Sequence, residues 1–319
     1  MIFARTGQEE EMRQQTIKKD IRCFGIGLHG GERVCLHLRP AAEDTGLVFV
    51  HRGTDGSRRF NLSPHKVIST DLATTIGNSE ASISTVEHLL AAVSGLGIDN
   101  LYIEVHGDEL PIMDGSAATF VFLLRSVGFR RQRLPRRILS FNRPLVYRSG
   151  ERWIKVKPYN GLKINYTIDF AHPMVGRQSY CFEHDPQQFV KSLAKARTFG
   201  FLQDVEKLQS MGLALGGSLN NAVVLDEYGV INPDGLRFND ELVRHKILDF
   251  MGDMALMGTP VWGAFDVHCS GHAFNNSFLR FLDKNKDDYL SRVEFDKQGH
   301  MLNVPVPERL PQPEPVPAC

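Results

Sequence analysis

The chain has 319 residues, which is long for one hydrophobic core and comfortable for two domains. Hydrophobic residues make up 42% and charged residues 23%, a composition typical of a globular protein. Lysine plus arginine and aspartate plus glutamate number 37 each, so no net charge favours nucleic acid or an acidic membrane surface. We therefore expect no nucleic-acid partner.

Targeting and redox signals point to the cytoplasm. The first twenty residues lack the apolar core of a signal peptide, and no stretch approaches about 18 continuous apolar residues. We therefore expect a cytoplasmic protein without stable membrane insertion. The five cysteines are scattered and contain no Cys-x-x-Cys pair, which favours reduced thiols over a disulfide framework or a structural zinc cluster.

The first part of the chain predicts mixed strands and helices. Residues 1–13 are charged and aperiodic, and we expect them to form a flexible extension. Alternating apolar and polar residues predict strands, and apolar residues at helical spacing predict helices. The strands are expected at 34–39, 47–50 and 100–106, and the helices at 83–93 and 117–127. This indicates a first α+β domain over residues 14–133.

A basic run then separates this region from a second one. Residues 130–137 contain few apolar side chains and a proline between arginines, which is typical of a linker, and we place the interdomain linker at residues 134–138. A second α+β domain is predicted over residues 139–302, and the proline-rich residues 303–319 predict a disordered tail. Its expected strands are 144–147, 153–157, 162–170, 222–225 and 261–267, and its helices are 186–196, 204–211, 240–257 and 273–282.

The helix predicted over 240–257 carries a polar stripe. His245, Asp249 and Asp253 follow one another at four-residue spacing, so they share one helix face. A histidine and an aspartate one turn apart can hold a divalent metal, because both are ordinary zinc ligands at about 2.0–2.2 Å. Alternatively, His245 is a surface residue that pairs with Asp249. Two ligands do not complete a metal site, so a third must come from elsewhere.

Glu87 and His88 allow two interpretations. Glu87 lies three residues after Ser84, so its carboxylate can close a capping box by accepting a hydrogen bond from the Ser84 backbone. In the other interpretation His88 is the third metal ligand and Glu87 takes a proton from water at the metal. The two exclude one another, since a carboxylate satisfied by the backbone is poorly free to act as a base.

Two further side chains could take part in catalysis. His272 follows a predicted strand, where a loop side chain can project into a cleft, and Asp253 could orient its ring and raise its pKa. That arrangement would suit a general acid, although an isolated loop histidine needs no such role. Thr198, at the end of a predicted helix, could donate a hydrogen bond to an oxyanion or simply to the local backbone.

Ten short segments occur in order from about Thr16 to Leu282. They are 25–30 (GIGLHG), 84–89 (STVEHL), 97–100 (GIDN), 111–117 (PIMDGSA), 157–161 (KPYNG), 167–170 (TIDF), 196–200 (ARTFG), 235–238 (GLRF), 243–249 (VRHKILD) and 270–272 (SGH). Any one segment would be weak evidence, but the ordered set is highly specific. Together the segments resemble the bacterial UDP-3-O-acyl-N-acetylglucosamine deacetylases, the zinc amidohydrolases that catalyse the committed step of lipid A synthesis.

The resemblance implies a fold and a metal site. It implies two similar α+β domains packed face to face, with the active site between them. The second domain would carry a βαβ-type insert around residues 199–230 that forms a hydrophobic passage for an acyl chain. The metal, Zn²⁺ or in the cell Fe²⁺, would be held by His88, His245 and Asp249.

The resemblance also implies a reaction. Glu87 would be the general base, and His272, supported by Asp253, would protonate the leaving amine. Thr198 and Lys246 would assist around the oxyanion and the substrate. The expected reaction removes the N-acetyl group of UDP-3-O-acyl-N-acetylglucosamine as acetate, and we expect a monomer that acts on this small molecule.

Substrate contacts are expected at Phe199 and in a nucleotide-binding group, in which Asp169 and Phe170 match a uracil-binding pair and Arg152 a basic phosphate contact. The chain departs from the family pattern at Cys269, because a basic residue commonly stands there and serves the nucleotide phosphates. The neighbouring His268 or Arg152 would then take over.

Two other classes of function compete with this hypothesis. A homologue that binds nucleotide sugars without hydrolysing them would be expected to lack at least one of the catalytic or ligand residues, and none is missing. An interaction protein could use the proline-rich tail for docking, but this would leave the converging polar residues unexplained.

Overall fold

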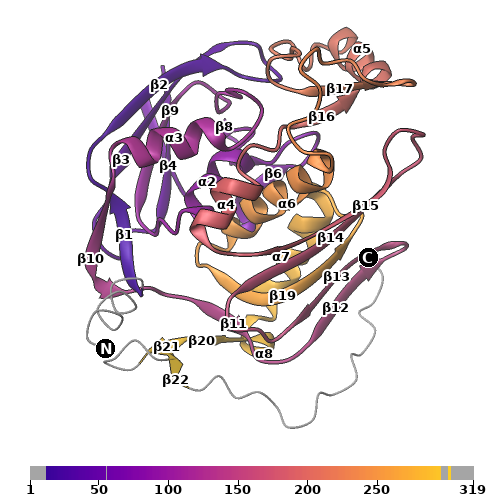
Figure 1. Ribbon diagram of the computed structural model, residues 1–319. Coiled ribbons are helices and arrows are strands. Elements are labelled where there is room, and N and C mark those ends of the chain that lie inside the picture. Colours follow the sequence, from indigo (N-terminus) through magenta and orange to yellow (C-terminus); the bar gives the residue numbers. More distant parts are fainter. Residues whose placement is uncertain (1–11, 55, 296–300, 303–319) are drawn as a thin grey trace.

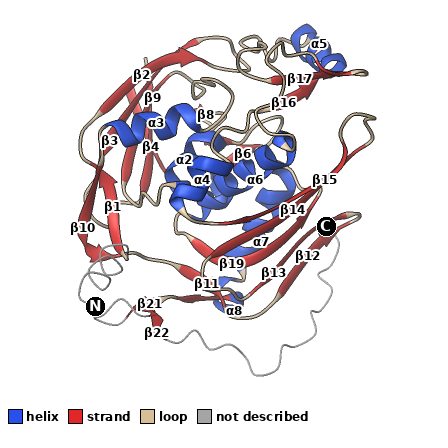
Figure 2. Cartoon of the chain, in the orientation of Figure 1, coloured by secondary structure: helices blue, strands red, loops and turns tan. Residues whose placement is uncertain are grey.

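The fold is α+β, with two main sheets on the outside and helices between them (Figures 1 and 2). The computed structural model describes residues 12–54, 56–295 and 301–302. The expectation of a mixed α+β fold is confirmed. Within these ranges no helix is both long and apolar enough to cross a membrane.

The first sheet has five strands in the order β2-β3-β9-β4-β5. Neighbouring strands are antiparallel except β4 and β9, which run parallel because the chain crosses over through helix α2 (Glu87–Gly95) between them. The strands are β2 (Ile21–Ile26), β3 (Arg33–Pro40), β4 (Leu47–Gly53), β5 (Gly56–Asn61) and β9 (Leu101–His106).

The second sheet repeats this order. Five of its seven strands run β12-β13-β19-β14-β15, again with one parallel pair, β14 and β19, joined by a crossover that contains helix α6 (Glu241–Met254). The five are β12 (Leu145–Ser149), β13 (Arg152–Lys157), β14 (Leu162–Phe170), β15 (Gly176–Glu183) and β19 (Val261–His268), and β11 (Leu139–Phe141) and β20 (Leu290–Arg292) extend the sheet. The two crossover helices therefore occupy equivalent positions in their sheets.

Helices α2 and α6 pack directly against each other. At Gly252 of α6 a Cβ atom would lie only 2.1 Å from the carbonyl oxygen of Glu87, so the close approach requires a residue without a side chain. The helices between the sheets also include α3 (Ala118–Ser126), α4 (Pro186–Ser192) and α7 (His272–Lys284).

Smaller elements complete the described chain. The expected βαβ insert is present, since β16 (Phe199–Phe201) runs parallel to β17 (Val223–Asp226) with α5 (Leu202–Ser210) between them. Figure 1 shows this unit at the upper edge of the molecule. The other elements are β1 (Arg13–Ile17), β6 (Val67–Ser69), β7 (Thr75–Gly77), β8 (Ser82–Ile83), β10 (Phe129–Pro135), β18 (Gly229–Val230), β21 (Glu294–Phe295), β22 (Met301–Leu302), α8 (Lys286–Tyr289) and the 3-10 turns Pro64–Lys66 and Ala255–Met257.

The first part of the basic run, up to Pro135, is a strand and not an unstructured linker. Strand β10 (Phe129–Pro135) pairs antiparallel with β1, so the backbone of its arginines is hydrogen-bonded while most of their side chains face solvent. Arg13, expected in the flexible extension, opens β1. Residues 1–11 and the tail 303–319 lie outside the described residues.

Two helix boundaries also differ from the prediction. Helix α2 begins at Glu87, four residues later than expected, because Thr85 has φ +57°, a left-handed conformation that the α-helix excludes. Helix α4 ends at Ser192, so Thr198 stands in a connecting segment and not at a helix end.

Candidate metal and catalytic site

The late start of α2 decides between the two interpretations of Glu87. Ser84 does not cap the helix: Val86 precedes its first residue, and no side chain caps it. The Ser84 hydroxyl instead accepts a hydrogen bond from Thr75. The capping-box interpretation is therefore wrong, and the Glu87 carboxylate is directed to the interior.

A second carboxylate holds the unusual backbone before α2. Glu109 accepts hydrogen bonds from the hydroxyl of Thr85 at 2.9 Å and from the backbone N–H groups of His29 and Gly30 at 3.0 Å each. Glu109 thus ties the glycine-rich turn after β2 to the residue that sets where α2 begins. Glu87 and His88 consequently occupy the first turn of α2, facing α6.

Helix α6 carries His245 and Asp249 in the interior. Both side chains are almost fully buried, so the alternative of a surface ion pair at His245 is wrong. Oδ1 of Asp249 lies 3.1 Å from Nε2 of His245 and 3.6 Å from Nε2 of His88. The three predicted ligands therefore meet where α2 and α6 cross, with one ligand atom from each within 4.8 Å of the others.

These three donors fit a divalent metal ion. Oδ1 of Asp249 is buried and has no hydrogen-bond partner among the described residues, which is costly unless a cation satisfies it. Ligand atoms about 2.1 Å from one tetrahedral ion lie roughly 3.4 Å apart, close to the observed separations. Burial lowers the pKa of His245, which favours the neutral imidazole that binds metals.

The outer environment orients two of the ligands. Nδ1 of His245 lies 3.1 Å from the carbonyl oxygen of Ala196, so it can donate there and leave Nε2 free to bind. Oδ2 of Asp249 accepts from Nζ of Lys246 at 2.9 Å. Although burial opposes ionisation, His245 and Lys246 hold the pKa of Asp249 well below its usual range.

Glu87 and His272 face each other beside the three ligands. Oε1 of Glu87 lies 3.7 Å from Nε2 of His272; the Glu87 side chain is buried and that of His272 is 10% exposed. Burial raises the pKa of Glu87 to about 7, partly offset by His272. Burial alone would lower the pKa of His272, but Asp253 and Glu87 outweigh it and raise this pKa to about 10. At neutral pH the imidazole is therefore protonated.

Asp253 orients the His272 ring. Its Oδ2 accepts from Nδ1 of His272 at 2.8 Å and from the side-chain amide of Asn275 at 2.8 Å. His272 is the first residue of α7 and not a loop residue as expected. Because Nδ1 is held by Asp253, Nε2 is the nitrogen that faces Glu87 and Asp249.

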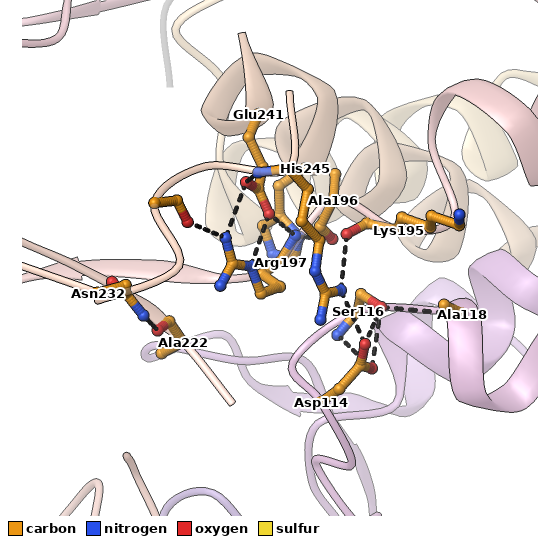
Figure 3. Close-up of polar contacts among 12 residues, drawn as sticks. Asp114, Ser116, Ala118, Lys195, Ala196, Arg197, Ala222, Asn232, Glu241 and His245 are labelled. Atoms are coloured by element: carbon orange, nitrogen blue, oxygen red, sulfur yellow. Dashed lines mark hydrogen bonds and ion pairs between the residues drawn. The ribbon is translucent and has the colours of Figure 1, made fainter. Parts of the chain in front are cut away.

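The segment with Thr198 runs along α6 beside His245. The backbone N–H of Thr198 donates to the carbonyl oxygen of Gly115 at 2.7 Å. The ring of the following residue, Phe199, lies edge-on to the ring of His245, and its centre is 5.4 Å from Nζ of Lys246. A buried ion pair fixes the segment: Nε of Arg197 donates to Glu241, one turn before His245, at 2.8 Å (Figure 3). No sequence pattern predicted this pair.

The expected nucleotide contacts lie at the same end of three neighbouring strands of the second sheet, β13, β19 and β14. Arg152 begins β13 and Trp153 pairs with His268, whose buried ring stacks on that of Trp153 at 4.1 Å. Asp169 and Phe170 end β14, and Phe170 packs edge-on against Phe199 at 5.7 Å. This end of the sheet thus adjoins the segment beside the predicted ligands.

Comparison with known proteins gives the family. The model of the UDP-3-O-acyl N-acetylglycosamine deacetylase (LpxC) family matches residues 14–284. The chain belongs to this family. Proteins named UDP-3-O-acyl-N-acetylglucosamine deacetylase match it from Oleidesulfovibrio alaskensis, with 58% identity over 90% of this chain and 94% of the relative, and from Nitratidesulfovibrio vulgaris, with 56% identity over 89% and 92%. One from Acidithiobacillus ferrooxidans is 46% identical over 88% of this chain and 95% of the relative.

The site also contains two residues, Asn275 and Thr74, that the sequence patterns did not predict, and both lie within the region that the family model matches. Asn275 lies three residues after His272, a helical spacing that could have suggested a shared contact. Thr74 gives no such signal. Its hydroxyl donates to Oδ1 of Asp253 at 2.7 Å, across 179 residues of sequence.

Proposed function

We propose that this protein hydrolyses the N-acetyl group of UDP-3-O-acyl-N-acetylglucosamine, giving acetate and UDP-3-O-acyl-glucosamine, the committed step of lipid A biosynthesis. The observation that carries the proposal is the convergence of His88, His245 and Asp249 with Glu87 and His272 in a single buried site. The names of the relatives support the substrate, and the converging residues support amide hydrolysis.

We propose Zn²⁺ as the metal, with Fe²⁺ as a possible substitute in the cell. Two imidazoles and one carboxylate are a donor set that catalytic zinc sites use. When bound, such an ion lowers the pKa of water and polarises a carbonyl group.

Glu87 accepts the proton of the attacking water in this proposal. Its carboxylate is buried, and Oε2 is held by the backbone N–H of Thr74 at 3.1 Å. The other oxygen, Oε1, faces His272. A carboxylate whose pKa is raised to about 7 by burial is well matched to proton transfer near neutral pH.

His272 donates the proton that the leaving nitrogen requires. It is protonated at neutral pH, and Asp253 fixes Nδ1 so that Nε2 faces the reacting group. Lys246 and the Thr198 hydroxyl are proposed to stabilise the negative charge on the former carbonyl oxygen.

Substrate binding is proposed for this end of the second sheet and for the insert. Asp169, Phe170, Arg152 and His268 would contact the nucleotide, and Phe199 the sugar. The insert 199–230 would line the acyl passage. We further propose that residues 14–133 and 139–302 are two related domains, as their equal strand order supports, and that the protein is a cytoplasmic monomer.

The test is acetate release from UDP-3-O-acyl-N-acetylglucosamine by the purified protein, before and after a chelator and again after Zn²⁺ is restored. We expect activity to fall with chelation and return with Zn²⁺. Glu87→Gln should bind metal and substrate normally and lower kcat by about 10²- to 10⁴-fold. If metal-loaded wild type bound the substrate and released no acetate, a non-catalytic nucleotide-sugar-binding protein would become the better account.

A further inference from the structure

Thr74 touches the candidate base and the partner of the candidate acid at once. It is 1% exposed and lies immediately before β7 in the first half of the chain. Its backbone N–H donates to Oε2 of Glu87 at 3.1 Å. Its hydroxyl donates to Oδ1 of Asp253 at 2.7 Å and lies 3.2 Å from Nδ1 of His272.

The direction of these hydrogen bonds follows from the donors present. Asp253 also receives the amide N–H of Asn275, so its carboxylate acts as an acceptor throughout. The hydroxyl proton of Thr74 therefore belongs to Asp253. The proton on Nδ1 of His272 points to the same carboxylate at 2.8 Å. Thr74 thereby fixes one oxygen of Asp253 and leaves the other to hold the imidazole.

Thr74 also links elements from the two halves of the molecule. Its carbonyl accepts from the backbone N–H of Val86 at 3.3 Å, directly before α2, while Asp253 lies on α6. One short segment therefore sets both where Glu87 stands and how the Asp253 carboxylate is turned.

We propose that Thr74 is a positioning residue that holds Glu87 and the Asp253–His272 pair in register for proton transfer. The inference rests on the proposed deacetylase function. Thr74 donates hydrogen bonds to the candidate base Glu87 and to Asp253, which orients the candidate acid. Its effect on the reaction is therefore exerted through these two carboxylates and not through contact with the substrate.

Thr74→Val tests the hydroxyl alone, because valine keeps the shape and the backbone N–H to Glu87. We expect kcat for acetate release to fall about 10- to 100-fold, as for other residues that orient catalytic groups, with KM and metal content within about twofold of wild type. Thr74→Ser should restore most of kcat. The matched control is Thr75→Val. The hydroxyl of Thr75 donates to Ser84 outside the site, so its removal should leave kcat unchanged.

A double-mutant cycle tests the route through Asp253. Once Asp253→Ala has removed the acceptor, adding Thr74→Val should cost less than about threefold further in kcat. An undiminished loss in that background, or a Thr74→Val enzyme as fast as wild type, would overturn the proposal.

An NMR measurement separates this inference from the proposed function. The Nδ1–H resonance of His272, observed in histidine-labelled protein at fixed pH, should shift in Thr74→Val and stay in place in Thr75→Val. An unmoved resonance would contradict the positioning role even if the protein released no acetate. Conversely, a shifted resonance in a protein without activity would support the role of Thr74 and count against deacetylation.

Discussion

His88 and His272 both place an imidazole near Asp249, yet we expect only His88 to hold the metal. Nε2 of His88 faces Oδ1 of Asp249 at 3.6 Å, whereas Nε2 of His272 lies 3.9 Å from Oδ2, which Lys246 already occupies. These distances support our proposal that His88 is a metal ligand and His272 a proton donor.

The variants His88→Ala and His272→Ala should therefore behave differently. Both remove an imidazole from one cavity, but only His88→Ala should weaken zinc binding, by more than about tenfold, because it removes one of three ligands. Metal analysis after gel filtration at limiting Zn²⁺ measures this. His272→Ala should retain its zinc and lose acetate release, and zinc loss in His272→Ala would count against the assigned ligand set.

Sequence patterns predicted the candidate site residues whose placement depends on local geometry. His245, Asp249 and Asp253 share a stripe because the helix period is fixed, and the helix carrying them formed where expected. Thr74 could not be found in this way. Its contact with Asp253 depends on how α2 and α6 pack, and the local sequence around Thr74 does not reveal that packing.

At the scale of elements, the ion pair of Arg197 and Glu241 joins the Thr198 segment to α6. Glu241 is fully buried and accepts from the backbone N–H and Nε of Arg197, at 3.0 and 2.8 Å, and from the backbone of Arg237. Burial raises its pKa, but these donors outweigh burial, so the pKa of Glu241 lies below its usual value.

Glu241→Gln should therefore destabilise the fold in a pH-dependent way. Losing one partner of a buried ion pair typically costs about 3–5 kcal/mol of unfolding free energy. Folding lowers the pKa of Glu241 below its unfolded value near 4.5. Its contribution to the free energy of unfolding is therefore complete above that unfolded pKa and is lost as the pH falls through the folded-state pKa. The difference between wild type and variant should thus be constant above about pH 5 and shrink below about pH 4.5.

Urea unfolding at a series of pH values measures this difference. Asp240→Asn is the matched control, because its partner Arg244 lies one turn along the same helix and Asp240 is partly exposed. Its loss should cost less than about 1 kcal/mol. Equal losses in the two variants would contradict a special role for the buried pair.

Six of the seven α-helices of the described residues were predicted, but only eight of their 22 strands, and the failures have physical causes. The apolar alternation of β14 gave its bounds of Leu162–Phe170 directly. The start of α2 was missed because the left-handed conformation at Thr85 depends on Glu109, which is distant in sequence. Strand β10 was missed because its arginine side chains face solvent and leave no alternation of apolar and polar residues. It is ordered by its backbone hydrogen bonds to β1.

At the scale of the whole molecule, the candidate ligands come from both halves of the chain. His88 lies on α2 and the other two ligands lie on α6, so a bound ion would connect elements that only the folded state brings together. Metal binding should therefore stabilise the global fold and not one helix alone.

Zn²⁺ should accordingly raise the thermal midpoint of wild type by more than that of His88→Ala, whose zinc affinity is lower. A ligand that binds only the folded state adds about 4 kcal/mol when its free concentration is a thousand times Kd. We expect a rise in Tm of several degrees in scanning calorimetry with chelated and zinc-loaded protein. An equal rise in His88→Ala would mean that the ion binds elsewhere.

The tight crossing of α2 and α6 also bears on biosynthesis. The backbone of Glu87 touches Gly252, so 164 residues must be synthesised between the two residues that make this contact. The nascent first half can form its sheet with His88 in place long before Asp249 has left the ribosome. It then offers only one of the three proposed ligands. If these residues hold the metal, the complete ligand set would form only after Asp249 has been synthesised, late in translation.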